Sequence, residues 1–208
     1  VTGPVRTGKS TFIKRFIESA VLPRMEGEYE RTQLRDELPQ SAGGRTVMTA
    51  EPKFIPDEAA SVVLPSGGTL KMKMIDCVGY LVPSALGAEE NGEVRMVHTP
   101  WDETPKPFEE AAEEGTRRVI RDHSTIGILV TSDGSFGDIA RDDFVDAEER
   151  VARELRESGK PFVLVVNSAH PDSPEAEALA LELEAKYDVP AALVDCTRLD
   201  EEDVLGIL

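Results

Sequence analysis

A glycine-rich stretch at the start of the chain constrains the fold more than any other feature. Residues 3–10 read Gly-Pro-Val-Arg-Thr-Gly-Lys-Ser, the complete spacing of a phosphate-binding loop that follows a strand and opens a helix. In such a loop, backbone N–H groups surround phosphate oxygens, the lysine pairs with the β and γ oxygens, and the serine ligates Mg²⁺. A glycine turn before an ordinary helix is the simpler alternative, and the complete spacing argues against it. The pattern predicts Lys9 on phosphate and Ser10 on Mg²⁺, with Gly3, Pro4, Val5, Arg6, Thr7, Gly8 and Thr11 around the nucleotide.

Hydrophobic patterning predicts that strands and helices alternate along the rest of the chain. We expect strands at residues 53–55, 61–64, 70–75, 126–131, 161–166 and 191–194, and helices at 10–21, 108–122, 142–157 and 174–187. A turn at 65–68 should join two of these strands as a hairpin. The runs 126–131 and 161–166 are rich in β-branched residues without alternation, which is typical of parallel strands buried on both faces. The order predicts an α/β fold of the P-loop NTPase type, with a mostly parallel sheet and helices on both faces.

The length of 208 residues fits one domain, residues 1–208. The chain begins with Val1, two residues before the glycine motif, and ends on the apolar stretch 203–208. We therefore expect a domain cut from a longer protein at both ends, with most of its first strand missing.

Three other stretches stand out. Residues 22–50 are polar and predict a long loop with a short helix near 28–38. Residues 80–115 form a second excursion around the only tryptophan, where His98 and Trp101 suggest a small satellite core more than a binding surface. The acidic stretch 142–149 predicts a solvated helix face.

Charge and composition exclude several classes of function. Twenty-three Lys and Arg residues stand against 40 Asp and Glu residues, giving a formal net charge of −17. Nucleic acid and anionic membranes should therefore be repelled. No apolar run reaches the roughly 20 residues that a membrane helix needs. The two cysteines, Cys77 and Cys196, lack metal-ligand spacing and predict buried free thiols in a reducing compartment.

An acidic residue must hold the magnesium ion from the far side of the phosphate site. Asp76 ends the expected strand 70–75 and opens Asp-Cys-Val-Gly, so Gly79 can direct its N–H toward a γ-phosphate. A strand-ending aspartate that caps a turn is the alternative. In the polar loop, Thr46 and Thr49 compete for the role of a threonine that contacts both the metal and the γ-phosphate. Thr49 is preferred because it lies directly before the expected return to the sheet.

These motifs resemble, in their order, those of the translation-factor-like GTPases. That family recognises guanine with Asn-Lys-x-Asp, whereas residues 167–170 here read Asn-Ser-Ala-His. His170 thus replaces the acid that accepts guanine's two N–H groups, and unpaired donors would cost about 1–3 kcal/mol each. We therefore predict ATP as the nucleotide, with Asn167 and His170 near its base, while an ordinary surface role for His170 stays open.

Two further departures from that family concern catalysis. Tyr80 follows Gly79, where related enzymes place Gln or His to orient the attacking water, so hydrolysis should be slow. Arg6 occupies a P-loop position where some relatives have an asparagine that coordinates potassium. We predict that its guanidinium replaces that cation, although a solvent-facing arginine is an open alternative.

Longer strings of residues resemble one family closely, the stage IV sporulation protein A family of spore-coat morphogenetic ATPases. These strings are residues 3–14, Met-Thr-Ala-Glu-Pro-Lys-Phe at 48–54, Met-Ile-Asp-Cys-Val-Gly-Tyr at 74–80 and Val-His-Thr-Pro-Trp at 97–101. The resemblance implies Mg²⁺-dependent ATP hydrolysis that drives self-assembly around the forespore, in the mother-cell cytoplasm. It also implies Lys9 on phosphate, Asp76 as the metal-side acid and Thr49 as the γ-phosphate sensor. One departure is Ala50, where the family often has a second threonine.

The resemblance also implies partners outside this stretch of sequence. The family's later regions are expected to contact coat proteins and a forespore membrane peptide. Two other functions stay open: a regulatory GTPase switch, against which the altered base motif argues, and a nucleotide-binding scaffold that never hydrolyses, which Tyr80 favours.

Overall fold

A parallel sheet forms the centre of the molecule. The computed structural model describes residues 1–39, 50–63, 67–85, 89–90 and 92–207. Strands β7 (Gly127–Ser132), β8 (Phe162–Asn167) and β9 (Ala191–Val194) form a three-stranded parallel sheet in the order β7-β8-β9. β7 and β8 are almost wholly buried, as the runs of β-branched residues predicted.

The first residues of the chain extend this sheet toward a hairpin. Thr2 bridges Leu129 of β7, and Pro4 bridges Tyr80, both in parallel orientation. Strands β1 (Lys53–Val63) and β2 (Thr69–Asp76) pair antiparallel, as expected. The amino group of Val1 donates to the carbonyl of Ile75 at 2.7 Å. Backbone hydrogen bonds of Val1, Thr2 and Gly3 to β7 and to residues 75–80 place the glycine motif between β7 and the end of β2.

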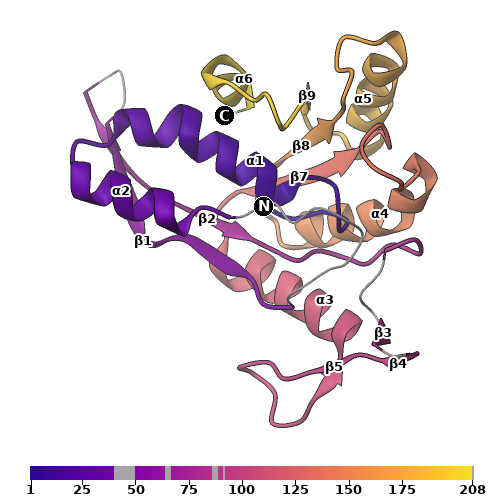
Figure 1. Cartoon of the computed structure of the whole chain (residues 1–208). Helices are drawn as coiled ribbons and strands as arrows, with labels where there is room; N and C mark the ends of the chain where they lie inside the picture. Colours follow the sequence, from indigo (N-terminus) through magenta and orange to yellow (C-terminus); the bar gives the residue numbers. More distant parts are fainter. Residues whose placement is uncertain (40–49, 64–66, 86–88, 91, 208) are drawn as a thin grey trace.

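Helices cover both faces of the sheet, which confirms the predicted architecture (Figure 1). One face carries α1 (Lys9–Phe16), its continuations η1 (Ile17–Val21) and η2 (Leu22–Arg24), α2 (Glu28–Glu37) and α6 (Glu201–Ile207). The other face carries α3 (Phe108–Arg118), its continuation η3 (Val119–His123), α4 (Arg141–Glu157) and α5 (Pro174–Tyr187). Neighbouring strand residues serve opposite cores: Val130 and Val165 pack toward α1, whereas Leu129 and Leu164 pack toward α4.

Several elements differ from the sequence-based expectation. The two expected strand pieces at 53–55 and 61–64 belong to one strand, β1, because the register shifts between Ile55 and Ala60 and pairing with β2 resumes after it. Where it is described, the excursion contains four unpredicted strands of two residues each, β3 (Glu89–Glu90), β4 (Glu93–Val94), β5 (Met96–Val97) and β6 (Lys106–Pro107). Helix α6 was not predicted either. Segments this short carry too few residues to display a period.

The prediction of a wholly solvated acidic face on α4 was wrong for one residue. Glu148 is fully buried. It accepts two hydrogen bonds from Arg141, at 2.7 and 2.9 Å, and one from the hydroxyl of Tyr187 at 2.8 Å. It also accepts from Thr131 on β7. A buried carboxylate with this many partners joins β7, α4 and α5, whereas the pattern of charges alone could not distinguish it from its exposed neighbours.

Smaller predictions are settled by burial. Both cysteines are free and buried. Phe108 and Ala111 of the excursion form a small core with Ala50, but neither predicted residue belongs to it: His98 is exposed and Trp101 is half-buried outside it. Among the described residues, no helix combines the length and the apolar character needed to cross a bilayer.

Candidate functional site

The glycine motif forms a tight loop between the first residues of the sheet and α1. Gly3 passes so close to β7 that a Cβ atom there would lie 2.1 Å from the carbonyl oxygen of Val130, so no other residue fits. The hydroxyl of Thr7 donates to the carbonyl of Pro4 at 3.0 Å and closes the loop on itself. Val5 is buried, and its N–H donates to the carbonyl of Tyr80 at 2.9 Å. These contacts define the path of the loop backbone.

Lys9 is the charged group at the centre of this loop. Its ammonium group donates to the carbonyls of Pro4, at 2.6 Å, and Gly3, at 3.4 Å, and only 6% of the residue is exposed. Burial is the main cause that lowers the pKa of Lys9 to about 8, an effect that the Asp76 carboxylate opposes and the Arg6 guanidinium reinforces. Placing an anion at this ammonium would favour its charged form.

Ser10 and Asp76 come together from different elements. The Ser10 hydroxyl, in the first turn of α1, donates to Oδ2 of Asp76 at the end of β2 at 2.6 Å. A hydroxyl and a carboxylate are the hard oxygen ligands that Mg²⁺ accepts when substrate phosphates and waters complete its shell. The described residues contain no group of three or more His, Cys, Asp and Glu side chains suited to a metal ion. The Ser10–Asp76 pair thus fits a magnesium ion shared with a phosphate.

Gly79 faces the loop from the segment after β2. Its φ angle is +88°, and a Cβ atom would lie 1.9 Å from the carbonyl oxygen of Gly3 and 3.0 Å from Nζ of Lys9. This close approach places its backbone beside the loop, as the motif predicts. Its N–H, however, donates to the hydroxyl of Thr116 on α3 at 3.2 Å. Sequence reasoning did not single out Thr116, because a threonine inside an amphipathic helix carries no motif.

The side chain of Tyr80 points into the core on the α4 side of the sheet. It is fully buried, and its hydroxyl donates to Glu154 on α4, which also accepts from Nε of Arg117 at 3.2 Å. The guanidinium of Arg150 lies 4.5 Å from its ring centroid. Burial is the largest cause of the raised pKa of Tyr80. The phenol is thus occupied by contacts with α3 and α4.

Arg6 lies at the bend of the loop. Its backbone is left-handed, with φ of +67°, and its side chain is half-buried. Burial lowers the pKa of its guanidinium, and its charge in turn lowers the pKa of Lys9. Two cations therefore lie close enough to interact electrostatically on one phosphate-binding loop, in a chain whose formal net charge is −17.

The side chain of Asn167, at the end of β8, hydrogen-bonds to the backbone of the glycine loop. Its Nδ2 donates to the carbonyl of Thr7 at 3.0 Å, and its Oδ1 accepts the N–H of Cys196 at 2.9 Å. The side chain therefore ties the glycine loop to the segment after β9. His170 follows three residues later on an exposed turn, with its N–H on the hydroxyl of Ser168 at 2.9 Å.

Two of the other predicted residues lie beside the start of α1, and the predicted threonine sensor is not described. Gly8 and Thr11 lie on either side of the start of α1. Thr49 and its competitor Thr46 lie outside the described residues, so the expected sensor role of Thr49 stays a prediction. The structure thus brings Lys9, Ser10, Asp76 and Gly79 together, and adds Thr116, which the sequence had not indicated.

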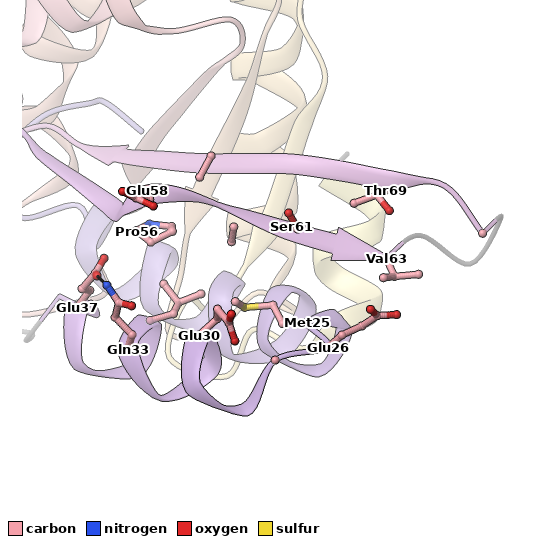
Figure 2. A pocket seen from close by; sticks show the side chains of 15 residues that line it. Met25, Glu26, Glu30, Gln33, Glu37, Pro56, Glu58, Ser61, Val63 and Thr69 are labelled. Carbon is pink, nitrogen blue, oxygen red and sulfur yellow. Dashed lines mark hydrogen bonds between the residues drawn. The ribbon is translucent and has the colours of Figure 1, made fainter.

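A separate groove of about 430 Å³ lies between α2 and β1 (Figure 2). Its lining includes the apolar side chains of Met25, Leu34 and Val63 and the acidic side chains of Glu30, Glu37 and Glu58. None of the predicted nucleotide ligands that the structure describes lines it. The groove is therefore distinct from the glycine-loop site.

Comparison with known proteins adds independent information. A family model described as "Stage IV sporulation protein A, ATPase domain" matches residues 1–208. Proteins named "Stage IV sporulation protein A" are 53% identical in Bacillus subtilis (strain 168), 50% in Bacillus anthracis and 49% in Clostridioides difficile (strain 630). Each similarity covers the whole chain of 208 residues and 42% of the relative's length.

Proposed function

We propose that this chain, which belongs to the stage IV sporulation protein A family and matches its ATPase domain, binds Mg²⁺–ATP. It then hydrolyses the ATP to ADP and phosphate. The observation that carries the proposal is the 2.6 Å contact between Ser10 and Asp76, beside the buried ammonium of Lys9. A metal ligand pair and a phosphate-binding cation next to one another are the minimum that phosphoryl transfer requires.

Each residue has a defined part in this proposal. Lys9 leaves the Pro4 carbonyl for the β- and γ-phosphate oxygens. Ser10 and Asp76 would hold Mg²⁺, which would neutralise charge that develops on the phosphates. The N–H of Gly79 donates to the γ-phosphate, and Thr49 serves as the γ-phosphate sensor. Gly8 and the first N–H groups of α1, up to Thr11, surround the remaining oxygens.

The choice of ATP over GTP rests on the segment after β8. Asn167 uses its Nδ2 on the glycine loop and its Oδ1 on the N–H of Cys196, and His170 stands where a guanine-binding acid would be. A histidine offers no carboxylate for the two N–H groups of guanine. A GTPase switch is therefore the weaker candidate. Comparable turnover of GTP and ATP at equal concentrations would favour it.

Turnover is expected to be slow. The phenol of Tyr80 is committed to Glu154 in the core, so the position after Gly79 supplies no group to orient the attacking water. Arg6, whose charge already acts on Lys9, is proposed to take the place of a potassium ion against the phosphates. The buried phenol also favours a second candidate, a scaffold that binds ATP without cleaving it.

Phosphate release by the purified chain tests these alternatives. We expect slow release from ATP that needs Mg²⁺ and disappears in Lys9→Ala and Asp76→Asn. Lys14→Ala, on the same helix but outside the glycine loop, is the matched control and should keep wild-type turnover. Binding of Mg²⁺–ATP with no release above the Lys9→Ala background would support the scaffold instead. Absence of binding would refute both.

The wider role extends beyond this chain, which spans 42% of the length of its relatives. In the proposal, hydrolysis drives self-assembly of a spore-coat protein on the mother-cell side of the forespore. Contacts with coat proteins and a forespore membrane peptide are assigned to regions of the relatives outside the matched part. Sedimentation of the full-length protein with ATP, compared with a nonhydrolysable analogue, tests whether assembly needs hydrolysis.

A further inference from the structure

One hydrogen bond engages the backbone group that the proposed function assigns to the γ-phosphate. The N–H of Gly79 donates to Oγ1 of Thr116 at 3.2 Å, and that hydroxyl donates to the carbonyl of Ala112 at 2.8 Å. Thr116 is fully buried. The hydroxyl hydrogen is directed at Ala112, so its lone pairs are available to Gly79 and the contact has a fixed orientation.

The next residue along the chain, Tyr80, is linked to α3 through a residue of α4. Tyr80 donates its hydroxyl to Glu154, and Arg117, which directly follows Thr116, donates to the same carboxylate at 3.2 Å. Thr116 of α3 thus contacts Gly79 directly, and Arg117 shares the Glu154 acceptor with Tyr80. A shift of the Gly79 backbone toward the nucleotide would change both contacts.

The preceding residue of α3 contacts another part of the molecule. A Cβ atom on Gly115 would lie 3.3 Å from Pro52 and 3.4 Å from the ring of Trp101. The guanidinium of Arg118 lies 5.4 Å from the centroid of that ring. One turn of α3 therefore touches the segment after β2, the residue before β1 and the only tryptophan of the chain.

We infer that Thr116 is a positioning residue that competes with the γ-phosphate for the N–H of Gly79, so that α3 responds to ATP and not to ADP. The inference rests on the proposed function. A single N–H makes one well-aligned hydrogen bond, so a γ-phosphate oxygen can take the Gly79 donor only by displacing the Thr116 hydroxyl. ADP has no γ-phosphate and leaves that contact in place.

Calorimetric binding of Mg²⁺–AMPPNP and Mg²⁺–ADP to the 208-residue chain tests the competition. Thr116→Val keeps the shape of the side chain and removes the acceptor. It should tighten AMPPNP binding about 2- to 10-fold, the equivalent of one net hydrogen bond, while ADP affinity changes less than about 2-fold. Thr116→Ser keeps the hydroxyl and should keep the wild-type ratio. Thr32→Val removes a comparable helical hydroxyl, exposed on α2, and is the matched control.

The ratio of the two affinities separates positioning from mere loss of stability. Equal changes for AMPPNP and ADP in Thr116→Val, or none, would overturn the inference while leaving the proposed function intact. A wild-type chain that binds neither nucleotide would overturn both.

A second readout needs no variant and covers the case in which Thr116→Val does not fold. Trp101 packs against the Gly115–Arg118 turn, so its fluorescence reports movement of α3. Mg²⁺–AMPPNP should change the emission of the wild-type chain, and Mg²⁺–ADP should not. Identical spectra in the two complexes would contradict a response of α3 to the γ-phosphate.

Discussion

Replacing Asn167 with aspartate tests how the glycine loop is fixed. The side chain is 5% exposed and bridges two backbone groups, the carbonyl of Thr7 and the N–H of Cys196. In Asn167→Asp the oxygen facing Cys196 is kept. The Nδ2 donor, 3.0 Å from the Thr7 carbonyl, becomes an oxygen of a buried carboxylate facing another oxygen. The variant thus changes one hydrogen bond into a repulsive contact with almost no change in volume.

The expected loss of unfolding free energy follows from the burial of the side chain and from the introduced charge. Losing a buried hydrogen bond costs about 1–3 kcal/mol, and an uncompensated buried charge raises the total to about 3–5 kcal/mol at pH 7.5. Protonation restores a donor toward Thr7. The folded-state pKa of the introduced carboxyl is therefore raised above its unfolded value near 3.9. The folded state then binds more protons, so stability falls as pH rises between these two pKa values, by about 1.4 kcal/mol per pH unit.

Urea unfolding at pH 7.5 and 5.5 measures the effect as a difference from wild type at each pH. Asn167→Asp should lose less stability at the lower pH. Asn167→Ala removes both bonds, introduces no titrating group, and should lose about 2–5 kcal/mol equally at both values. A pH-independent loss in the aspartate variant, or no loss at all, would refute the bridge between Thr7 and Cys196.

Three further outcomes follow from the same site. Gly79→Ala places a Cβ atom 1.9 Å from the carbonyl oxygen of Gly3 at a φ of +88°. The variant should lose about 2–4 kcal/mol of unfolding free energy in urea and bind Mg²⁺–ATP more weakly, whereas wild-type stability would disprove the close approach. Because the pKa of Lys9 is about 8, ATP affinity should be nearly constant below pH 7.5. Above pH 8 the amine must gain a proton before it binds phosphate, so affinity should fall by up to about tenfold per pH unit. Equal calorimetric affinities at pH 7.5 and 9.5 would contradict this. Tyr80→Phe removes the bond to Glu154 and should cost about 1–2 kcal/mol, seen as a lower thermal midpoint, and an unchanged midpoint would show that the phenol does not need that partner.

The sequence predicted the parts of the site that carry fixed spacing. The glycine motif has a required length because backbone groups must surround a phosphate, and Asp76 follows a strand whose alternation is visible in the chain. Thr116 and Glu154 escaped prediction because their roles arise from packing between helices far apart in the sequence. The prediction that Glu148 is solvated was wrong for the same reason, since a buried and an exposed glutamate look alike in a helical pattern. The short strands β3 to β6 and helix α6 were not predicted, because a hydrophobic period needs several residues to be recognised.

In the proposed function, nucleotide binding at the loop is an exchange of hydrogen-bond partners. Lys9 is bonded to Pro4, Ser10 to Asp76, and Gly79 to Thr116. Each of these donors gives up a protein acceptor when it takes a phosphate oxygen or a metal ion, so hydrogen bonding alone contributes little net affinity. The favourable part must then come from charge, which two neighbouring cations supply on the loop. The γ-phosphate of ATP brings charge that ADP lacks and that Lys9 and Arg6 attract, and in our proposal it also takes the Gly79 N–H from Thr116. The proposal therefore predicts that the preference for ATP over ADP falls as α3 holds that N–H more strongly, a contribution from a helix that need not touch the nucleotide.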